Sequence, residues 1–285
     1  MMENNTLSKK VDFMAIITVE NANPNGDPLN GNRPRQHYDN TGFITPVCIK
    51  RKLRNRLQDM GNKILIQQND RVDDDLKSIS ERLDSVPEIK AARQKKDNDT
   101  IAVKVCETFQ DVRAFGATIA LKDKTSVGVR GPVTIQQASS IGAVDIDSNQ
   151  ITKSTNSEPG DTKGSDTMGM LHSVRYGIYV IKGSMNPILA GRTGFSDEDA
   201  DDMKKALHTL FENDESAARP SGSMNVYRLY WWEQPRDDIR YSSKKLFDSI
   251  HISMKDPDDI LSSIDDIEIQ EDDFPDIKPE IIEEY

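Results

Sequence analysis

The sequence predicts an α+β protein whose body has the ferredoxin-like order βαββαβ. Three observations support this fold class. Short β-branched apolar runs alternate with segments of helical spacing, a polar turn follows the first run, and two long polar stretches interrupt the pattern. Without those stretches the predicted order is strand, helix, helix, strand, strand, helix, strand. Merging the two early helices gives βαββαβ, so we expect one body that carries two insertions.

The first strand is predicted over residues 11–19, which are short, apolar and β-branched. Residues 21–28 cannot continue it, because they hold three Asn, two Pro and one Gly. Proline lacks the N–H that a ladder needs, and Asn and Gly tolerate left-handed backbone. Thr45 and Pro46 then begin a helix that runs to about Met60, and the following glycine suits its end.

The later elements follow from apolar spacing and from helix-start signals. Residues 101–115 have a helical apolar stripe. Residues 127–137 are predicted to form a strand, which Pro132 places at a sheet edge or breaks with a bulge. Ser196 and Asp199 make a capping box for the last helix of the body. Further strands are predicted over residues 172–181 and 224–232.

The two polar stretches are predicted to be insertions. Residues 62–98 have the spacing of short helices. Residues 142–170 consist mostly of Gly, Ser, Thr, Asn and Asp, and such a composition cannot bury enough apolar area to order itself. Because long loops in compact domains are usually functional or disordered, we expect a flexible loop there.

Composition excludes several classes of protein. The chain of 285 residues is 35% hydrophobic and 30% charged, and no apolar run approaches the roughly 20 residues of a membrane span. Its start has no apolar signal-peptide core. The two cysteines and four histidines have no metal-ligand spacing, so we expect a reduced cytoplasmic setting, no metal and no cofactor. Walker, nucleophile-elbow and Ser/His/Asp patterns are absent, so no catalytic residue is predicted.

The charge is unevenly distributed. The formal net charge is −11, but residues 256–285 hold 13 acidic residues and one Lys, which leaves the other 255 residues near +1. Residues 1–60 hold nine Lys/Arg against six Asp/Glu. A local field matters more to a phosphate chain than the global sum. The amides of residues 21–28 and the cations of residues 50–56 therefore suggest a cradle for nucleic acid. The acidic end is either a solvated tail or a segment that contacts basic neighbours or mimics nucleic acid.

Five motifs occur in order along the chain: N-P-N-G-D-P at 23–28, G-N-R-P-R at 31–35, V-C-I-K-R-K-L-R-N at 47–55, F-Q-D-V-R-A-F-G at 109–116 and R-G-P-V-T-I-Q-Q-A-S at 130–139. Together they resemble the repeated backbone subunit of type I CRISPR Cascade complexes, subtype I-C. The resemblance covers roughly residues 10 to 235. The long acidic C-terminus and the acidic balance depart from what is expected of a chain that coats RNA.

The resemblance implies an architecture and a role. It implies an RRM-like palm (residues 11–60, 101–138 and 171–235), a helical finger insertion (61–100) and a flexible thumb loop (139–170). Residues 236–285 are then left as an acidic C-terminal extension. Copies would polymerise along one guide RNA (crRNA) in an antiviral ribonucleoprotein with other Cascade subunits. That complex recognises target DNA through guide pairing, and a separate helicase-nuclease cuts. The subunit itself would be non-catalytic, cytoplasmic and independent of membranes.

A guide of variable sequence must be held through phosphates and sugars, not through base edges. Lys50 and Arg54 are one helical turn apart and are expected to share a face, as are Lys52 and Arg56. The sheet-face signature of RNA-recognition domains is absent, so loops and the basic helix should bind. The RNA-binding candidates are Asn21, Asn23, Asn25, Gly26, Arg33, Arg35, Lys50, Arg51, Arg54, Arg113, Arg130, Gln136, Gln137 and Arg175, with Met168 and Met170 as apolar wedge tips.

Two other functions stay open at this point. Related backbone subunits of type III complexes cut target RNA with a loop aspartate, and Asp27 lies in the corresponding kind of loop. A single carboxylate can bind Mg²⁺ when phosphate and water complete the shell, although Asp27 also suits turn formation. The other alternative is a monomeric RRM-like RNA-binding module.

Overall fold

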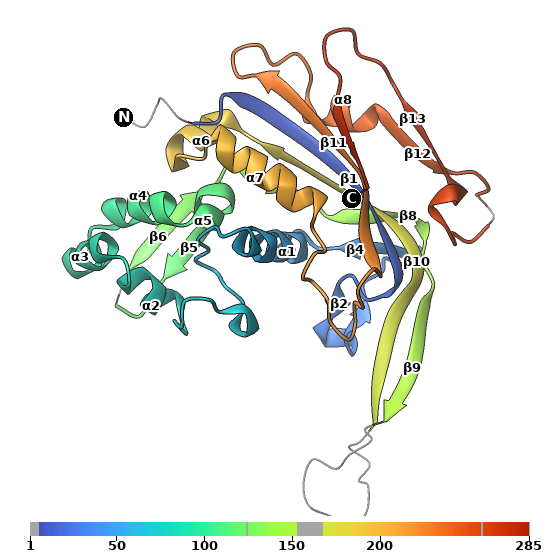
Figure 1. Cartoon of the computed structure of the whole chain (residues 1–285), viewed down its shortest axis with the longest axis horizontal. Helices are drawn as coiled ribbons and strands as arrows, with labels where there is room; N and C mark the ends of the chain where they lie inside the picture. Colours follow the sequence, from blue (N-terminus) through green and yellow to red (C-terminus); the bar gives the residue numbers. More distant parts are fainter. Residues whose placement is uncertain (1–5, 124, 153–167, 258, 285) are drawn as a thin grey trace, which may run out of the picture.

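The computed structural model describes residues 6–123, 125–152, 168–257 and 259–284. These residues form an eight-stranded sheet with helices on one face, a separate helical region beside it and a C-terminal layer on the other face (Figure 1). The ladder of the main sheet is antiparallel, with strand order β14-β11-β1-β10-β8-β4, and β7 and β9 also pair with β10. The predicted α+β class is therefore confirmed.

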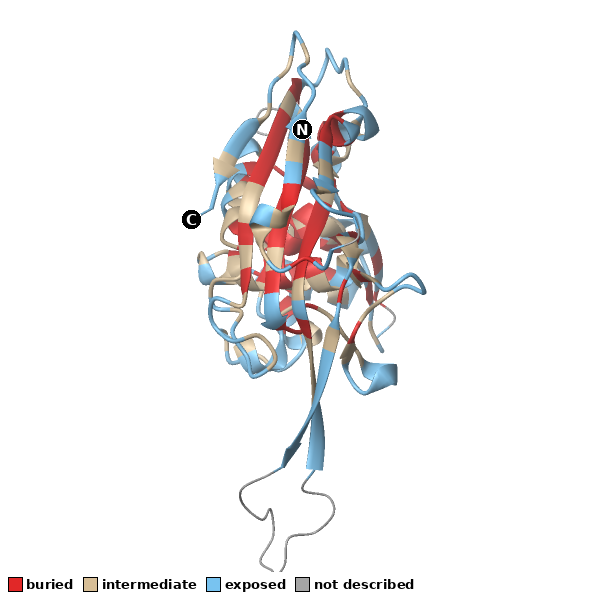
Figure 2. Cartoon of the chain, turned by 90° about the vertical axis from the view of Figure 1, so that its right-hand side faces the viewer, coloured by how far each residue is buried: buried red, intermediate tan, exposed pale blue. Residues whose placement is uncertain are grey.

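Three long strands form the centre of the sheet. β1 (Lys9–Ala22) pairs with β10 (Met168–Met185) on one side and with β11 (Met224–Pro235) on the other. Alternate residues of β1 enter two different apolar clusters, so both faces of the strand are buried. A strand buried on both faces needs a continuous apolar run, which is the pattern of residues 11–19. Figure 2 shows buried positions along these strands.

The first face of the sheet is covered by α1 (Pro46–Asp59), α6 (Pro187–Thr193) and α7 (Asp197–His208). The predicted start of α1 is confirmed: Thr45 Oγ1 accepts a hydrogen bond from the Cys48 amide at 3.3 Å, and Pro46 follows the cap. The capping box of Ser196 and Asp199 at the start of α7 is also confirmed. Both α1 and α7 thus begin after a residue whose side chain accepts a hydrogen bond from a backbone N–H that the helix leaves free.

The second face is covered by the C-terminal segment, which holds α8 (Ser243–Asp248), β12 (Ile250–Met254), η4 (Ile264–Asp266), β13 (Ile267–Glu271) and β14 (Glu280–Glu283). Leu246, Phe247 and Ile267 pack there against Tyr230 and Trp232 of β11. The expectation of a solvated acidic tail is therefore wrong. The alternative, contact with basic neighbours, is confirmed by the ion pairs Arg228–Glu283 (3.0 Å) and Lys204–Glu280 (2.8 Å).

The helical region follows α1 and has its own core. It consists of η2 (Asn69–Arg71), α2 (Ile79–Asp84), α3 (Pro87–Lys95), α4 (Asn98–Thr108), α5 (Gln110–Phe115), β5 (Gly116–Ala120) and β6 (Ser126–Arg130). The helix expected over residues 101–115 is broken at Phe109, whose backbone is extended. Ile101 and Val105 of α4 join the core of this region, which extends as far as Val127. The helical region thus continues well beyond residue 100, where the sequence placed the end of the helical insertion, because the apolar stripe of α4 packs on α3.

The loop expected over residues 139–170 is in large part a pair of strands. β8 (Ala138–Ala143) lies in the main sheet, and β9 (Ile146–Thr152) pairs with residues 168–174 of β10. The paired β9 and β10 form a two-stranded ribbon that projects from the body (Figure 1), and its far part is exposed (Figure 2). Backbone ladder bonds hold the ribbon, so its order needs little apolar burial. Residues 153–167 lie outside the described part of the chain.

The segment between β1 and α1 is folded into small elements. It holds β2 (Gly26–Asp27), η1 (Pro28–Asn30), β3 (Arg33–Pro34) and β4 (Thr41–Ile44). β7 (Val133–Ile135) and β8 then follow the helical region and return the chain to the sheet beside β10. We call residues 21–35 the Asn-rich loop. It stands at the base of the ribbon, next to the start of α1.

Candidate nucleic-acid interface

The Asn-rich loop is organised by its own amides. Asn23 is 3% exposed, and its Nδ2 donates to the Asn32 carbonyl at 2.6 Å. The Oδ1 of Asn25 accepts from the Thr45 amide at 2.9 Å, which ties the loop to the start of α1. At Gly26 a Cβ would lie 2.0 Å from the Asn32 side chain, so glycine is required for this close approach. The predicted roles of Asn23 and Asn25 as RNA ligands thus compete with contacts inside the protein, whereas Asn21 is exposed.

Asp27 is a turn-forming residue in this loop. Its Oδ1 accepts from the Leu29 amide at 3.1 Å, and the carboxylate lies 3.4 Å from Nη2 of Arg35. The backbone of Asn32 donates to the Asp27 carbonyl at 2.8 Å. Asp27 therefore uses its charge to hold Arg35 and to begin the short η1 helix.

The cations of α1 divide into two groups. Lys52, Arg54 and Arg56 form ion pairs with Asp214, Asp111 and Glu212, respectively. Lys50 and Arg51 form no ion pair with any described residue: the Lys50 ammonium lies 5.3 Å from the Phe115 ring centre, and Arg51 donates to the Ile66 carbonyl at 2.7 Å. The predicted sharing of an open face by Lys50 and Arg54 is thereby corrected, because Arg54 is buried against a carboxylate.

Partial burial changes the pKa of both Lys50 and Arg51. Burial, and then the charge of Arg54, lower the pKa of the Lys50 ammonium. The same two causes, with Asp111 acting in the opposite direction, lower the pKa of Arg51. These cations are therefore short of anionic neighbours, so an added phosphate would stabilise them.

Arg113 is likewise engaged by a carboxylate, and only 19% of its side chain is exposed. Its guanidinium holds Asp199 through two hydrogen bonds of 2.8 and 2.7 Å, and Nη1 donates to the Cys106 carbonyl at 2.9 Å. Asp111, on the same helix, accepts from Arg54 at 2.9 Å and from the Leu65 amide at 2.8 Å. Arg54 and Arg113 thus fasten the helical region to α1 and α7, which corrects the expectation that they are open cations.

A second group of RNA-binding candidates is exposed between the end of β6 and the start of β8. Gly131 packs against the backbone around Phe115, where a Cβ would lie 2.3 Å from the Ala114 carbonyl, and Arg130 pairs with Gly116 in the β5–β6 ladder. Arg130, Gln136 and Gln137 are all exposed. Nε2 of Gln137 lies 3.1 Å from Nε2 of His37. The predicted residues between β6 and β8 thus stand at the surface, where a ligand can reach them.

The base of the ribbon contributes a third group. Arg33 donates to Ser148 Oγ at 2.8 Å, and Nδ1 of His172 lies 2.8 Å from the same oxygen. Arg175 is 66% exposed and lies 4.0 Å from Asp147. Further along, Met168 and Met170 are 58% and 53% exposed, as a wedge would require. The Asn-rich loop and the ribbon are therefore joined by hydrogen bonds at a surface that carries cations.

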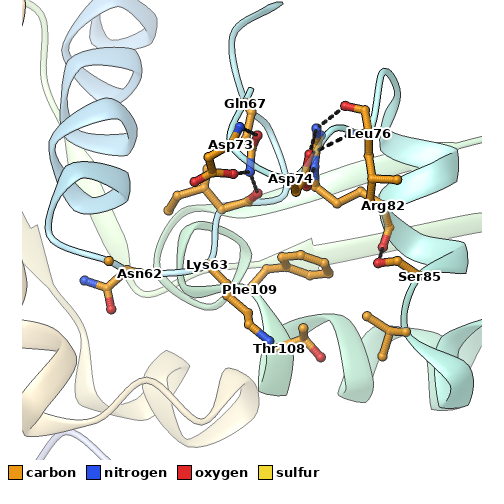
Figure 3. Close-up of a pocket in the computed structure, with 13 residues that line it drawn as sticks. Asn62, Lys63, Gln67, Asp73, Asp74, Leu76, Arg82, Ser85, Thr108 and Phe109 are labelled. Atoms are coloured by element: carbon orange, nitrogen blue, oxygen red, sulfur yellow. Dashed lines mark hydrogen bonds and ion pairs between the residues drawn. The ribbon is translucent and has the colours of Figure 1, made fainter. Parts of the chain in front are cut away.

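A hollow of about 290 Å³ lies within the helical region (Figure 3). Arg82 and Phe109 line it, but the Arg82 guanidinium already donates to Asp74 and to the carbonyls of Leu65 and Leu76. The RNA-binding candidates do not line this hollow. It is therefore separate from the candidate interface.

The described residues contain no group of three or more His, Cys, Asp or Glu that could hold a metal ion. Within the same residues, no helix is both long and apolar enough to cross a membrane.

Comparison with known proteins identifies the family. The model of the family described as CRISPR-associated protein Cas7 matches residues 9–272. This chain belongs to the Cas7 family. The CRISPR-associated protein Cas7 of Haloferax volcanii is 25% identical over 227 residues, which cover 73% of this chain and 66%, just under two thirds, of that protein. A chain of the solved structure named "CRISPR RNA-guided surveillance complex, pre-nicking" has 16% identity and a TM-score of 0.50, with 78% of each chain covered. At that identity the likeness shows the fold alone.

In this Cas7-family chain the structure adds interface residues that the sequence does not suggest. His37 stacks on Phe43 at 4.5 Å between ring centres and faces Gln137. His172 joins Arg33 at Ser148, and Ile151 is exposed on the ribbon beside the predicted methionines. Scattered histidines have no informative spacing, so only the tertiary structure brings them to the candidate RNA surface.

Proposed function

We propose that this Cas7-family chain is a non-catalytic crRNA-binding subunit that polymerises along guide RNA in a type I-C Cascade surveillance complex for antiviral defence. The observation that carries the proposal is the distribution of cations. Arg33, Lys50 and Arg130 form no ion pair with a described residue, and each stands at or beside the Asn-rich loop, α1 or the end of β6. Many other cations are paired with carboxylates, so these three are available to phosphates.

We further propose a ferredoxin-like, RRM-like palm. The order β11, β1, β10 and then β7 or β8 supports it, because four strands numbered along the chain as 1 to 4 then stand in the order 4-1-3-2. The helix α1 follows the first of them and α7 precedes the last. In this proposal the helical region is the finger and the β9–β10 ribbon is the thumb.

The palm would not use its sheet for RNA, because the C-terminal segment covers the face opposite α1 and α7. RNA would instead lie against the Asn-rich loop, the unpaired cations of α1 (Lys50 and Arg51), Arg130 and the ribbon. Contacts with phosphate and ribose hold any guide, and they leave base edges free for pairing with target DNA. The exposed methionines of the ribbon would enter between bases.

The subtype rests on the five motifs, which occur in order and all lie in or beside this surface or the helices that support it. Cytoplasmic location and assembly with other Cascade subunits follow from the same proposal. Copies of the chain would bind side by side, and a longer RNA would hold more of them. We expect the particle mass to increase stepwise with RNA length. A mass that stays at one copy per RNA would favour the monomeric RNA-binding module.

Asp27 provides a test of the non-catalytic role. Its carboxylate is engaged by the Leu29 amide and by Arg35, which suits a turn better than a metal ligand. We expect that the chain with bound guide leaves complementary RNA uncut in Mg²⁺, as judged on a denaturing gel. We also expect the same result for Asp27→Ala. Cuts at regular spacing that vanish in Asp27→Ala would show a ribonuclease instead.

A further inference from the structure

The segment between α7 and β11, residues 209–223, is held by the paired cations of α1. Lys52 is 4% exposed at its side chain and forms an ion pair with Asp214. Arg219, from the same segment, donates from Nε to the same Asp214 oxygen, Oδ2, at 3.0 Å. Arg56 donates to Thr209 Oγ1 at 2.7 Å and also pairs with Glu212. We call this segment, residues 209–223, the clamped segment.

The clamped segment in turn holds the Asn-rich loop. The Asn23 amide donates to the Ala218 carbonyl at 2.8 Å, and the Glu20 amide donates to the Ser223 carbonyl at 2.8 Å. The Asn23 side chain continues to the Asn32 carbonyl. Lys52 is thus linked through Asp214 to Arg219, whose neighbour in the chain, Ala218, accepts from Asn23 of the loop.

One thiol reports on this arrangement. Cys48 lies on α1 one turn before Lys52, and its Sγ is 3.6 Å from the Pro24 carbonyl of the Asn-rich loop. If the loop moved away from α1, this sulfur would lose its cover.

We propose that Lys52 and Asp214 are positioning residues for RNA binding, because they fix the clamped segment and thereby set the distance between the Asn-rich loop and the unpaired cations of α1, Lys50 and Arg51. This inference rests on the proposed function. Lys52 is too deeply buried to contact a phosphate itself. A buried pair of this kind contributes little net stability. Loss of Asp214 leaves Lys52 and Arg219 without their shared counter-charge, and loss of Lys52 removes the contact by which α1 holds Asp214.

The test uses the full chain with Lys52→Met or Asp214→Asn and two single-stranded RNAs of equal length and unrelated sequence. We expect both variants to bind both RNAs about tenfold more weakly, as when the ordered loop is populated about a tenth of the time. The dependence of affinity on salt should keep the wild-type slope, because no phosphate contact is removed. Lys52→Arg keeps the cation and should restore binding.

The thiol gives a second readout, measured in a Cys106→Ser background so that Cys48 is the one cysteine. A maleimide should label Cys48 several-fold faster in Lys52→Met than in the parent, and at the parent rate in Lys52→Arg. A role in overall stability alone would leave the affinity of the folded protein unchanged, and it would raise the labelling rate only in proportion to the unfolded population. If Lys52→Met and Asp214→Asn both fail to fold, RNA affinity and the labelling rate of Cys48 are measured in Arg219→Gln. This variant removes only the contact of Arg219 with Asp214.

The outcomes separate the two proposals. Failure of the wild-type chain to bind RNA would overturn the proposed function. Wild-type binding with unchanged affinity in Lys52→Met and Asp214→Asn would overturn the positioning role alone. A reduced salt slope in Lys52→Met would overturn it too, because Lys52 would then contact the RNA directly.

Discussion

Reversing the charges of Lys50 and Arg51 to Glu should weaken RNA binding about equally for unrelated sequences. These cations of α1 lack a carboxylate partner among the described residues: Lys50 lies against the Phe115 ring, and Arg51 donates to the Ile66 carbonyl. Each lost phosphate contact should flatten the log–log dependence of affinity on salt by about 0.7, so the pair should flatten it by about 1.4. Titrations of two unrelated single-stranded RNAs over a range of salt measure both quantities.

The matched control reverses two exposed lysines elsewhere, Lys90 on α3 and Lys205 on α7. It changes the net charge by the same amount, so it shows how much of the effect comes from the overall field. The control should keep most of the wild-type slope. A loss that is large for one RNA and small for the other would contradict binding through the backbone.

Asp111→Ala should strongly destabilise the folded protein. Asp111 is fully buried, holds Arg54 at 2.9 Å and accepts from the Leu65 and Ile66 amides. Removal leaves a buried guanidinium without its counter-charge, which costs about 3–5 kcal/mol of the free energy of unfolding. The midpoint of denaturant unfolding measures this loss.

The control for this prediction is Asp238→Asn. Asp238 also pairs with an arginine, Arg240, but both side chains are more than half exposed. Solvent screens such a pair, so its loss should leave the unfolding midpoint unchanged. An equal shift in the two variants would show that burial does not decide the value of the Asp111 pair.

The parts of the fold with local signals could be predicted from the sequence. Thr45 and Pro46 begin α1, and Ser196 and Asp199 begin α7, because caps are satisfied by residues three or four positions away. The central strands are evident from their apolar runs. The ribbon could not be predicted, because backbone hydrogen bonds between β9 and β10 hold it together. Such bonds require no particular side chains, so a polar sequence gives no signal for them.

The partners of charged side chains could not be predicted in the same way. Five cations in seven residues suggest one basic surface, yet Arg54 meets Asp111 and Lys52 meets Asp214, which lie far along the chain. The contacts of the C-terminal segment could not be predicted for the same reason. Its acidic composition is evident in the sequence, whereas its ion pairs with Arg228 and Lys204 depend on the tertiary fold. Local sequence thus located the candidate interface, and only the structure separated its open cations from its paired ones.

The nature of the RNA that copurifies with the native protein tests the central claim most directly. Sequencing should find RNAs of defined length, with constant repeat-derived ends around inserts that vary from molecule to molecule. Such RNAs are what a subunit that holds the ribose-phosphate chain of a guide, whatever its bases, would retain. Copurified RNA without common ends, or a native protein free of RNA, would contradict the account.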